Sequence, residues 1–214
     1  FASTYKVDVD EFQQKISDVS MKLFGKRSGR IKPGLDDKIL LGWNAMMIAG
    51  LTDASLSLQS QKSLDMAEKA MWFIENHLIE NETAFRSFKD KHSSTAAFLE
   101  DYVFLIAAYL KLYQATFKES YLMKGKRWTE KVIEDFFDTE DGYFHFSSRS
   151  SEKLIARKKE IFDNVIPSAN SMMARNLLAL SNYFDRNDWR EIATQMVSKL
   201  SNLILTETAY MANW

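Results

Sequence analysis

Apolar residues recur at helical spacing in three separate segments of the chain. The first segment carries its apolar residues on a single face: Leu64, Ala67, Met71, Ile74 and Leu78. Segments 122–136 and 189–203 repeat this design, with charged residues between the apolar ones. A one-sided pattern of this kind is typical of an amphipathic helix that buries one face.

A different pattern precedes each of these segments. Residues 39–51 and 102–110 are apolar nearly all round, and residues 172–184 are only slightly more polar. A helix without a polar face must be covered on two sides. The sequence therefore predicts three helical hairpins, each pairing a doubly covered inner helix with a singly covered outer helix.

The hairpins repeat at an interval of about sixty residues, which indicates a stacked array with longer joints than tetratricopeptide or HEAT repeats have. Alternating inner and outer helices predict an all-α fold, an α/α toroid, formed by residues 1–214 as a single domain. Joints 83–88 and 141–146 alternate in polarity and contain aromatic residues, which predicts short β-hairpin-like strands. A further helix, residues 9–24, and a basic linker, residues 25–34, precede the hairpins. Three hairpins and one helix do not close a ring, so either the ring is open or its remainder belongs to a longer protein.

Composition excludes several classes of protein. The content of 46% hydrophobic and 13% aromatic residues excludes intrinsic disorder, and the net charge of -1 gives no field for nucleic acid or an anionic membrane. Zero cysteines exclude a disulfide scaffold, a thiol nucleophile and a thiolate zinc site. We expect no metal and no cofactor. The sequence contains no signal-peptide pattern and no apolar run of membrane-spanning length, which predicts a cytoplasmic protein.

Polar residues gather where each inner helix begins. The clusters are Asp36, Asp37 and Lys38, then Glu100 and Asp101, then Ser168, Asn170 and Ser171. Because inner helices of a toroid run parallel, their N-terminal ends are expected to meet at one mouth. The joint before the third inner helix adds Arg157, Lys159, Glu160 and Asp163, and Trp43, Tyr102 and Tyr143 offer aromatic faces. Carboxylates among aromatic rings are suited to a sugar-like, polyhydroxylated ligand.

A structural role competes with the functional one at each cluster. Asp36 or Asp37 and Ser168 are residue types that cap helix N-termini. Glu100 and Asp101 fall inside an apolar run, where a buried carboxylate needs a cation, a donor or water. Arg157 or Lys159 would form such an ion pair, and a catalytic acid is the alternative.

The histidines add little to the candidate site. His77 falls on an outer helix and is expected at the surface, while His92 and His145 fall in joints. A toroid epimerase would need paired histidines on inner helices, where this sequence has none. An epimerase or isomerase is therefore the least favoured enzyme class.

Three stretches resemble a known family when taken together: residues 32–48, 98–105 and 157–171. They resemble the thioredoxin-domain-containing family of spermatogenesis-associated protein 20 and its bacterial relatives. The resemblance implies a toroid of the six-hairpin glycosidase kind, taken from a longer protein whose thioredoxin-like domain is absent here. It also implies a set of site residues: Asp36, Asp37, Lys38, Trp43, Asn44, Glu100, Asp101, Tyr102, Arg157, Lys159, Glu160, Asp163, Ser168, Asn170 and Ser171. Ala45, Asn164 and Ala169 depart from the family's usual glycines.

Two functions remain open from the sequence. The first is a toroid that binds or processes a carbohydrate, with Asp37, Glu100, Asp101 and Asp163 as candidate catalytic carboxylates and the other residues of the set as substrate-binding groups. The second is a non-catalytic module that docks proteins or peptides for a thioredoxin-like domain, with a structural polar mouth. Exposed apolar flanks of an incomplete ring also predict self-association.

Overall fold

A computed structural model describes residues 5, 8–90, 92–93, 95–150 and 157–214. The chain divides into two compact units, Phe1–Asp37 and Lys38–Trp214. The first unit contains helix α2 (Val9–Ser28), which confirms the expected helix and extends it by one turn. Asp8 caps α2 by accepting a hydrogen bond from the Glu11 N–H at 2.9 Å, and Lys26 and Arg27 lie in the last turn, where cations oppose the helix dipole.

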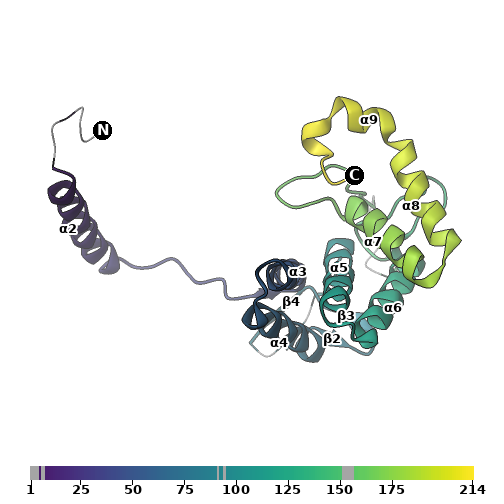
Figure 1. The fold of residues 1–214 in the computed structure, drawn as a ribbon, viewed down its shortest axis with the longest axis horizontal. Helices are drawn as coiled ribbons and strands as arrows, with labels where there is room; N and C mark the ends of the chain where they lie inside the picture. Colours follow the sequence, from purple (N-terminus) through teal and green to yellow (C-terminus); the bar gives the residue numbers. More distant parts are fainter. Residues whose placement is uncertain (1–4, 6–7, 91, 94, 151–156) are drawn as a thin grey trace. The chain divides into compact units, whose positions relative to one another are not determined.

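Three antiparallel helical hairpins form the second unit (Figure 1). They are α3 (Leu41–Leu58) with α4 (Gln61–His77), α5 (Leu99–Thr116) with α6 (Glu119–Phe136), and α7 (Ala169–Phe184) with α8 (Asn187–Lys199). Each hairpin turns at a left-handed residue directly after its first helix: Gln59, Phe117 and Asp185, at φ of 52°, 53° and 50°. A left-handed residue at this position ends a helix and reverses the chain within a few residues.

The helices form two layers, as the hydrophobic pattern predicts. Helix α5 packs between α3 and α7, and it also packs against its own partner α6. Its side chains are consequently buried nearly all round, including Leu105, Ile106 and Tyr109, whereas α4 and α6 bury one face each. The expected outer helix over residues 189–203 breaks at Leu200, after which α9 (Ser201–Thr206) and a short 3-10 turn (Thr208–Tyr210) follow.

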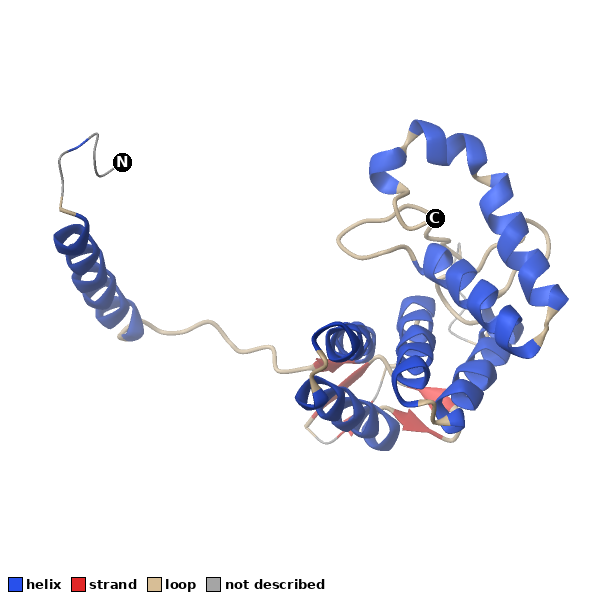
Figure 2. Ribbon diagram, in the orientation of Figure 1, coloured by secondary structure: helices blue, strands red, loops and turns tan. Residues whose placement is uncertain are grey.

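Short strands occupy the first long joint and the segment just before α3 (Figure 2). Strand β1 (Ile39–Leu40) pairs antiparallel with β4 (Ser87–Lys89), which pairs with β5 (His92–Ser93). Strands β2 (Ile79–Glu80) and β3 (Thr83–Ala84) form a hairpin whose two turn residues, Asn81 and Glu82, both have positive φ, the conformation that tight hairpins prefer.

The second long joint differs from the expected strand. Between residues 141 and 146 the described structure holds a single bridge, between Phe137 and Phe144. The alternating aromatic residues are instead explained by packing, because Phe144 is fully buried in the core. Within the described residues, no helix combines the length and apolarity needed to cross a membrane.

Candidate functional site

The carboxylate of Asp101 joins the N-terminal ends of two inner helices. Its Oδ1 accepts the N–H of Gly42 on α3 at 3.2 Å, and its Oδ2 accepts the N–H of Phe98 at 3.0 Å. The side chain of Arg86 donates to the same Oδ2 at 3.0 Å. Asp101 is only 2% exposed. Its oxygens are therefore engaged by protein donors, and the residue functions as a structural junction between α3 and α5.

Burial raises the pKa of Asp101, and the Phe98 N–H and the positive charge of Arg86 oppose that rise. The same Arg86 Nη1 lies 2.6 Å from Oε1 of Glu100, and its guanidinium stacks over the Phe98 ring at 5.2 Å. One arginine thus forms ion pairs with two neighbouring carboxylates at the start of α5.

The expected ion pair of Glu100 and Asp101 with Arg157 or Lys159 is wrong. Arg157 donates to the backbone carbonyl of Ser147, and Lys159 binds Asp138 and Asp141 at 2.6 Å each. Arg86 was missed because it comes from a different joint, although its place in the alternating segment 83–88 was a usable signal. Antiparallel pairing of β4 with β1 holds this joint beside the start of α3, where Leu41 N–H donates to the Arg86 carbonyl.

A second polar cluster fixes the N-terminal end of α7. Ser168 is the N-cap and accepts from the Ser171 N–H at 3.2 Å, which confirms its capping role. Asp163 accepts the N–H of Ser168 at 2.8 Å and the N–H of Asn213 at 2.9 Å. The cluster therefore ties the preceding joint and the C-terminal segment to α7.

Asn170 is fully buried, and its side-chain amide forms hydrogen bonds with backbone groups. Its Oδ1 accepts the Phe144 N–H at 2.8 Å, and its Nδ2 donates to the carbonyls of Phe144 and Glu160 at 3.0 Å each. Asn170 thereby satisfies backbone groups that the missing strand pairing would otherwise have satisfied.

Other residues of the expected set lie apart from these clusters. Tyr102 is a core residue that packs on Trp128 and Phe136, and Asn44 donates to the Leu40 carbonyl. Trp43 is largely exposed on α3. Asp36 and Asp37 belong to the first unit; the N-cap of α3 is Leu40, so the expected capping of α3 by either aspartate is wrong.

A cavity of about 520 Å³ opens beside the start of α7. Segment 158–168 forms most of its wall, and Glu100 and Tyr210 complete it. Five residues of the expected set line it: Glu100, Lys159, Glu160, Asp163 and Ser168. Sequence reasoning missed Lys158, Phe162 and Tyr210. Lys158 lies 2.7 Å from Glu160, and this carboxylate, with a smaller contribution from Glu100, raises the pKa of Lys158.

An ionic network adjoins the cavity, because Lys159, one of the lining residues, takes part in it. Oδ2 of Asp138 lies 2.6 Å from the Lys159 ammonium and 3.1 Å from Nε2 of His145. The hydrogen bond from Lys159 is the main reason that the pKa of Asp138 falls to about 2. Burial, followed by the charges of Arg157 and Lys159, lowers the pKa of His145. His77 is exposed as expected, while the side chain of His92 lies outside the described structure.

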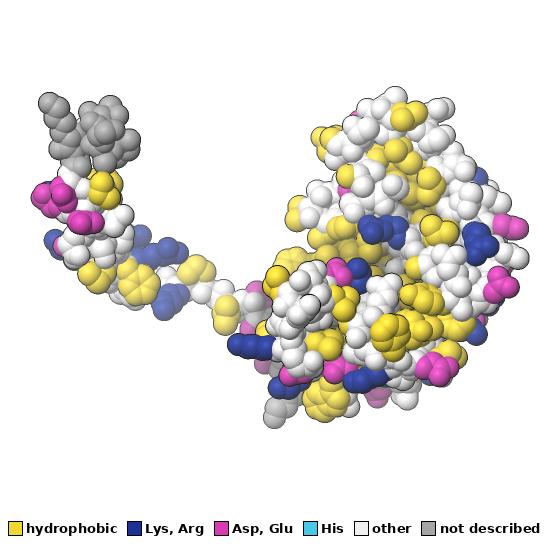
Figure 3. Space-filling model, viewed as in Figure 1, with side chains coloured by type: hydrophobic (Ala, Val, Ile, Leu, Met, Phe, Trp, Pro, Cys, Tyr) yellow, Lys and Arg dark blue, Asp and Glu magenta, His cyan; other side chains and the backbone are white. Residues whose placement is uncertain are grey.

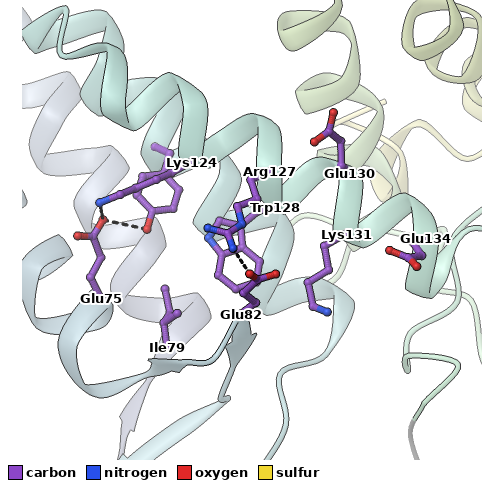
Figure 4. A pocket seen from close by; sticks show the side chains of 10 residues that line it. Glu75, Ile79, Glu82, Lys124, Arg127, Trp128, Glu130, Lys131 and Glu134 are labelled. Carbon is purple, nitrogen blue, oxygen red and sulfur yellow. Dashed lines mark hydrogen bonds and ion pairs between the residues drawn. The ribbon is translucent and has the colours of Figure 1, made fainter.

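A second cavity, of about 470 Å³, lies between outer helices α4 and α6 and strand β2. Figure 4 shows Lys124 pointing to Glu75 and Arg127 pointing to Glu82. The hydroxyl of Tyr109 also donates to Glu75, at 3.0 Å. Burial raises the pKa of Tyr109 above its usual range, so its hydroxyl stays protonated and donates to Glu75. These pairs connect neighbouring helices, and the cavity contains none of the residues expected at the mouth. Across the described residues, no group of three or more His, Asp or Glu side chains is arranged to hold a metal ion.

Comparison with known sequences identifies related proteins. The chain is 32% identical to the uncharacterized protein B0495.5 of Caenorhabditis elegans over 91% of its own length, and 28% identical to human spermatogenesis-associated protein 20 over 94%. It spans 27% of the length of each of these relatives. No family model matches the chain.

Comparison with solved structures identifies the fold. The chain resembles cellobiose 2-epimerase of Bacillus thermoamylovorans with a TM-score of 0.62 and 16% identity, over 78% of this chain and 46% of the epimerase. It also resembles a family 76 glycoside hydrolase (mannosidase) of Bacteroides thetaiotaomicron, with a TM-score of 0.62 and 12% identity over 78% of this chain and 45% of the hydrolase. The expectation drawn from the three motifs is confirmed: the chain is similar to spermatogenesis-associated protein 20 and has an all-α, six-hairpin glycosidase-like α/α-toroid fold.

Proposed function

We propose that this chain binds a carbohydrate in the 520 Å³ cavity formed by segment 158–168, Glu100 and Tyr210. The observation that carries the proposal is the cavity itself, where carboxylates, ammonium groups and aromatic rings lie together beside the start of α7. Its volume falls in the range of small-molecule sites, about 300–1,000 Å³. The solved proteins with the same fold include enzymes named for sugars, which makes this ligand class the natural first choice.

The ligand would be held by carboxylates that have oxygens left to accept further hydrogen bonds. Asp101 and Asp163 already accept several protein donors, so they serve the ligand indirectly by fixing the walls. Glu100 and Glu160 are each bound through Oε1 to a single cation, Arg86 and Lys158. We assign the direct contacts with sugar hydroxyls to these two glutamates, and stacking against the sugar ring to Phe162 or Tyr210.

This assignment changes the set of candidate catalytic groups. If the site hydrolyses a glycosidic bond with inversion, one carboxyl acts as acid and the other as base at a separation of about 6.5–9.5 Å. Three carboxylates line the cavity, and Asp163 already accepts the N–H groups of Ser168 and Asn213. Glu100 and Glu160 are therefore the candidate pair. Asp101 is positioned to hold Arg86, and Arg86 in turn holds Glu100.

The test is a binding screen of monosaccharides and oligosaccharides by ligand-observed NMR, followed by titration calorimetry on any hit. We expect Glu160→Gln to weaken a hit at least tenfold, while Glu191→Gln on the exposed surface of α8 leaves it unchanged. An inert cavity, or a sugar whose affinity is the same in Glu100→Gln, Glu160→Gln and the unmodified chain, would contradict the proposal.

A protein-docking role is a second candidate, supported by a different observation. Most hydrogen bonds of Asp101, Asp163 and Asn170 serve the backbone of other segments, as a structural mouth requires. Phe162 and Val165 on the cavity segment are exposed apolar residues that a partner could cover. In a longer protein that carries both regions, Val165→Glu would then reduce binding to, or activity of, the thioredoxin-like domain. The carbohydrate site predicts no such effect.

A further inference from the structure

Carboxylates outnumber their cations at the Glu100 side of the 520 Å³ cavity. Arg86 is shared by two of them, because its Nη1 lies 2.6 Å from Oε1 of Glu100 and 3.0 Å from Oδ2 of Asp101. The three side chains are 29%, 18% and 3% exposed, so water screens their charges only in part. This trio therefore keeps a negative charge at the cavity wall that Glu100 forms.

The opposite wall shows the same imbalance. The ammonium of Lys159 lies 2.6 Å from a carboxylate oxygen of Asp138 and 2.6 Å from one of Asp141, so one cation again serves two carboxylates. Asp163 accepts two backbone N–H groups and makes no ion pair with any residue that the structure describes. The N-terminal end of α7 offsets only about half a unit of this charge. The excess negative charge therefore extends along both walls.

One ammonium group already occupies a carboxylate of the cavity. Nζ of Lys158 lies 2.7 Å from Oε1 of Glu160. The hydrogen bond to Glu160, and to a smaller extent the charge of Glu100, raise the pKa of Lys158. The Lys158 side chain is 70% exposed, and an ion pair so open to water is weak. The cavity thus holds an ammonium group that a ligand can replace.

The imbalance is local to this cavity. In the 470 Å³ cavity the pairs between its two walls are one to one: Glu75 binds Lys124 at 2.6 Å, and Glu82 binds Arg127. Figure 3 shows acidic and basic side chains interspersed in small groups over the drawn face, and the net charge of the chain is only -1. Attraction of a cation to the 520 Å³ cavity would therefore come from its own walls.

We propose that the ligand of the 520 Å³ cavity is an amino sugar, whose protonated amino group replaces the Lys158 ammonium on Glu160. This inference rests on the proposed function, because it names the class of carbohydrate that the same site binds. The ammonium of the ligand would form a charge-assisted hydrogen bond with Glu160, while ring hydroxyls donate to Glu100. A sugar that carries a carboxylate or a phosphate would be repelled by the excess negative charge.

The test compares sugars that differ in a single group. Glucosamine, galactosamine and mannosamine are each titrated beside the parent hexose at mildly acidic pH, where the amino group is protonated. At least one amino sugar should bind about tenfold more tightly than its parent, as expected for a hydrogen bond between charged groups. Glucuronic acid should bind more weakly than glucose.

The outcomes separate this inference from the proposed function. Equal affinities within every pair, with binding that Glu160→Gln weakens, would overturn the amino-sugar inference and leave the carbohydrate site in place. A lack of binding by all of these sugars would overturn both.

Two variants test the replacement of Lys158 directly. Lys158→Met removes the competing ammonium and should raise the ratio of amino-sugar to hexose affinity about threefold. Glu160→Gln should bring that ratio close to one. The matched control is Lys62→Met, an exposed lysine of α4 that does not line the cavity and should leave the ratio unchanged. Circular dichroism must show equal helicity. A preference that survives Glu160→Gln, or one that falls in Lys158→Met, would refute the inference.

A further probe distinguishes a sugar from a bare amine. Nα-acetyl-lysine methylamide carries the same ammonium group without a sugar ring and represents a lysine side chain of a peptide. It should bind about tenfold more weakly than the preferred amino sugar, because it lacks the ring hydroxyls. Equal affinity would replace the amino sugar by a peptide lysine as the occupant and so contradict the inference.

Discussion

The starts of α5 and α7 are built from similar polar residues but use them differently. At the start of α5, Asp101 is nearly inaccessible and holds Gly42, Phe98 and Arg86. Beside the start of α7, Glu160 borders an open cavity and makes a single ion pair with Lys158. Acidic residues beside the starts of these two helices thus divide into those that hold the helices together and those that border the cavity. Chemical type does not separate the two groups; the number of protein donors around each carboxylate does.

The largest expected effect is at Asp101. Asp101→Ala removes one of the two carboxylates that bind Arg86, and it leaves the N–H groups of Gly42 and Phe98 without this acceptor in a buried site. The free energy of unfolding should therefore fall by about 3–5 kcal/mol. Glu160→Ala removes an exposed pair and should change stability by less than about 0.5 kcal/mol. Urea denaturation measures both. Equal losses for the two variants would remove the distinction between the two groups.

Asn170 gives the next largest effect and extends the comparison to an uncharged residue. Asn170→Ala leaves buried backbone groups of Phe144 and Glu160 without partners, each costing about 1–3 kcal/mol. We expect a total loss of about 2–4 kcal/mol, accompanied by weaker ligand binding because the cavity wall shifts. Asn202→Ala on exposed α9 serves as the control and should be nearly neutral. Stability close to that of the unmodified chain would show that Asn170 is not structural.

Gly42 and Gly50, both on α3, test how closely this helix packs against Asp101. A Cβ at Gly42 would lie 3.0 Å from Oδ1 of Asp101, whereas a Cβ at Gly50 would meet nothing within 4 Å. Gly42→Ala should therefore destabilise the chain by about 1–3 kcal/mol through crowding. Gly50→Ala should stabilise it by about 0.5–1 kcal/mol through helix propensity. Thermal unfolding of the pair should show midpoints shifted in opposite directions.

The smallest expected effect concerns the ion pair of Asp138 with Lys159 beside the cavity. The pKa of Asp138 is lowered to about 2, so its pairing contributes stability above the unfolded pKa near 3.9 and loses that contribution as pH falls toward 2. Lys159→Met should raise the pKa of Asp138 toward 3.8 in an NMR titration. The difference in free energy of unfolding between this variant and the unmodified chain should be present above about pH 4 and should disappear as the pH falls further. Lys158→Met, which removes a cation from the cavity side, should leave the pKa of Asp138 unchanged.

Much of the fold followed from local patterns. Helical periodicity located α3 to α8, because burial leaves its trace in the residues of the helix itself. The prediction of a doubly covered helix is confirmed for α5, whereas α3 leaves Trp43 and Met47 exposed and α7 leaves Leu178 exposed. Capping by Ser168 was likewise readable, since the donor at Ser171 lies three residues away. The second joint was misread as a strand because aromatic alternation also arises when a loop packs its rings into the core.

The polar partners were decided by tertiary structure. Arg86 reaches Glu100 and Asp101 from another joint because β1 and β4 pair, and Asn170 meets Phe144 because the hairpins stack. Spacing along the chain carries no information on contacts that depend on how separate elements pack. The sequence by itself therefore determined which helices form and which residues carry charge, while the packing of those helices decided which charges are bound by the protein and which border the cavity.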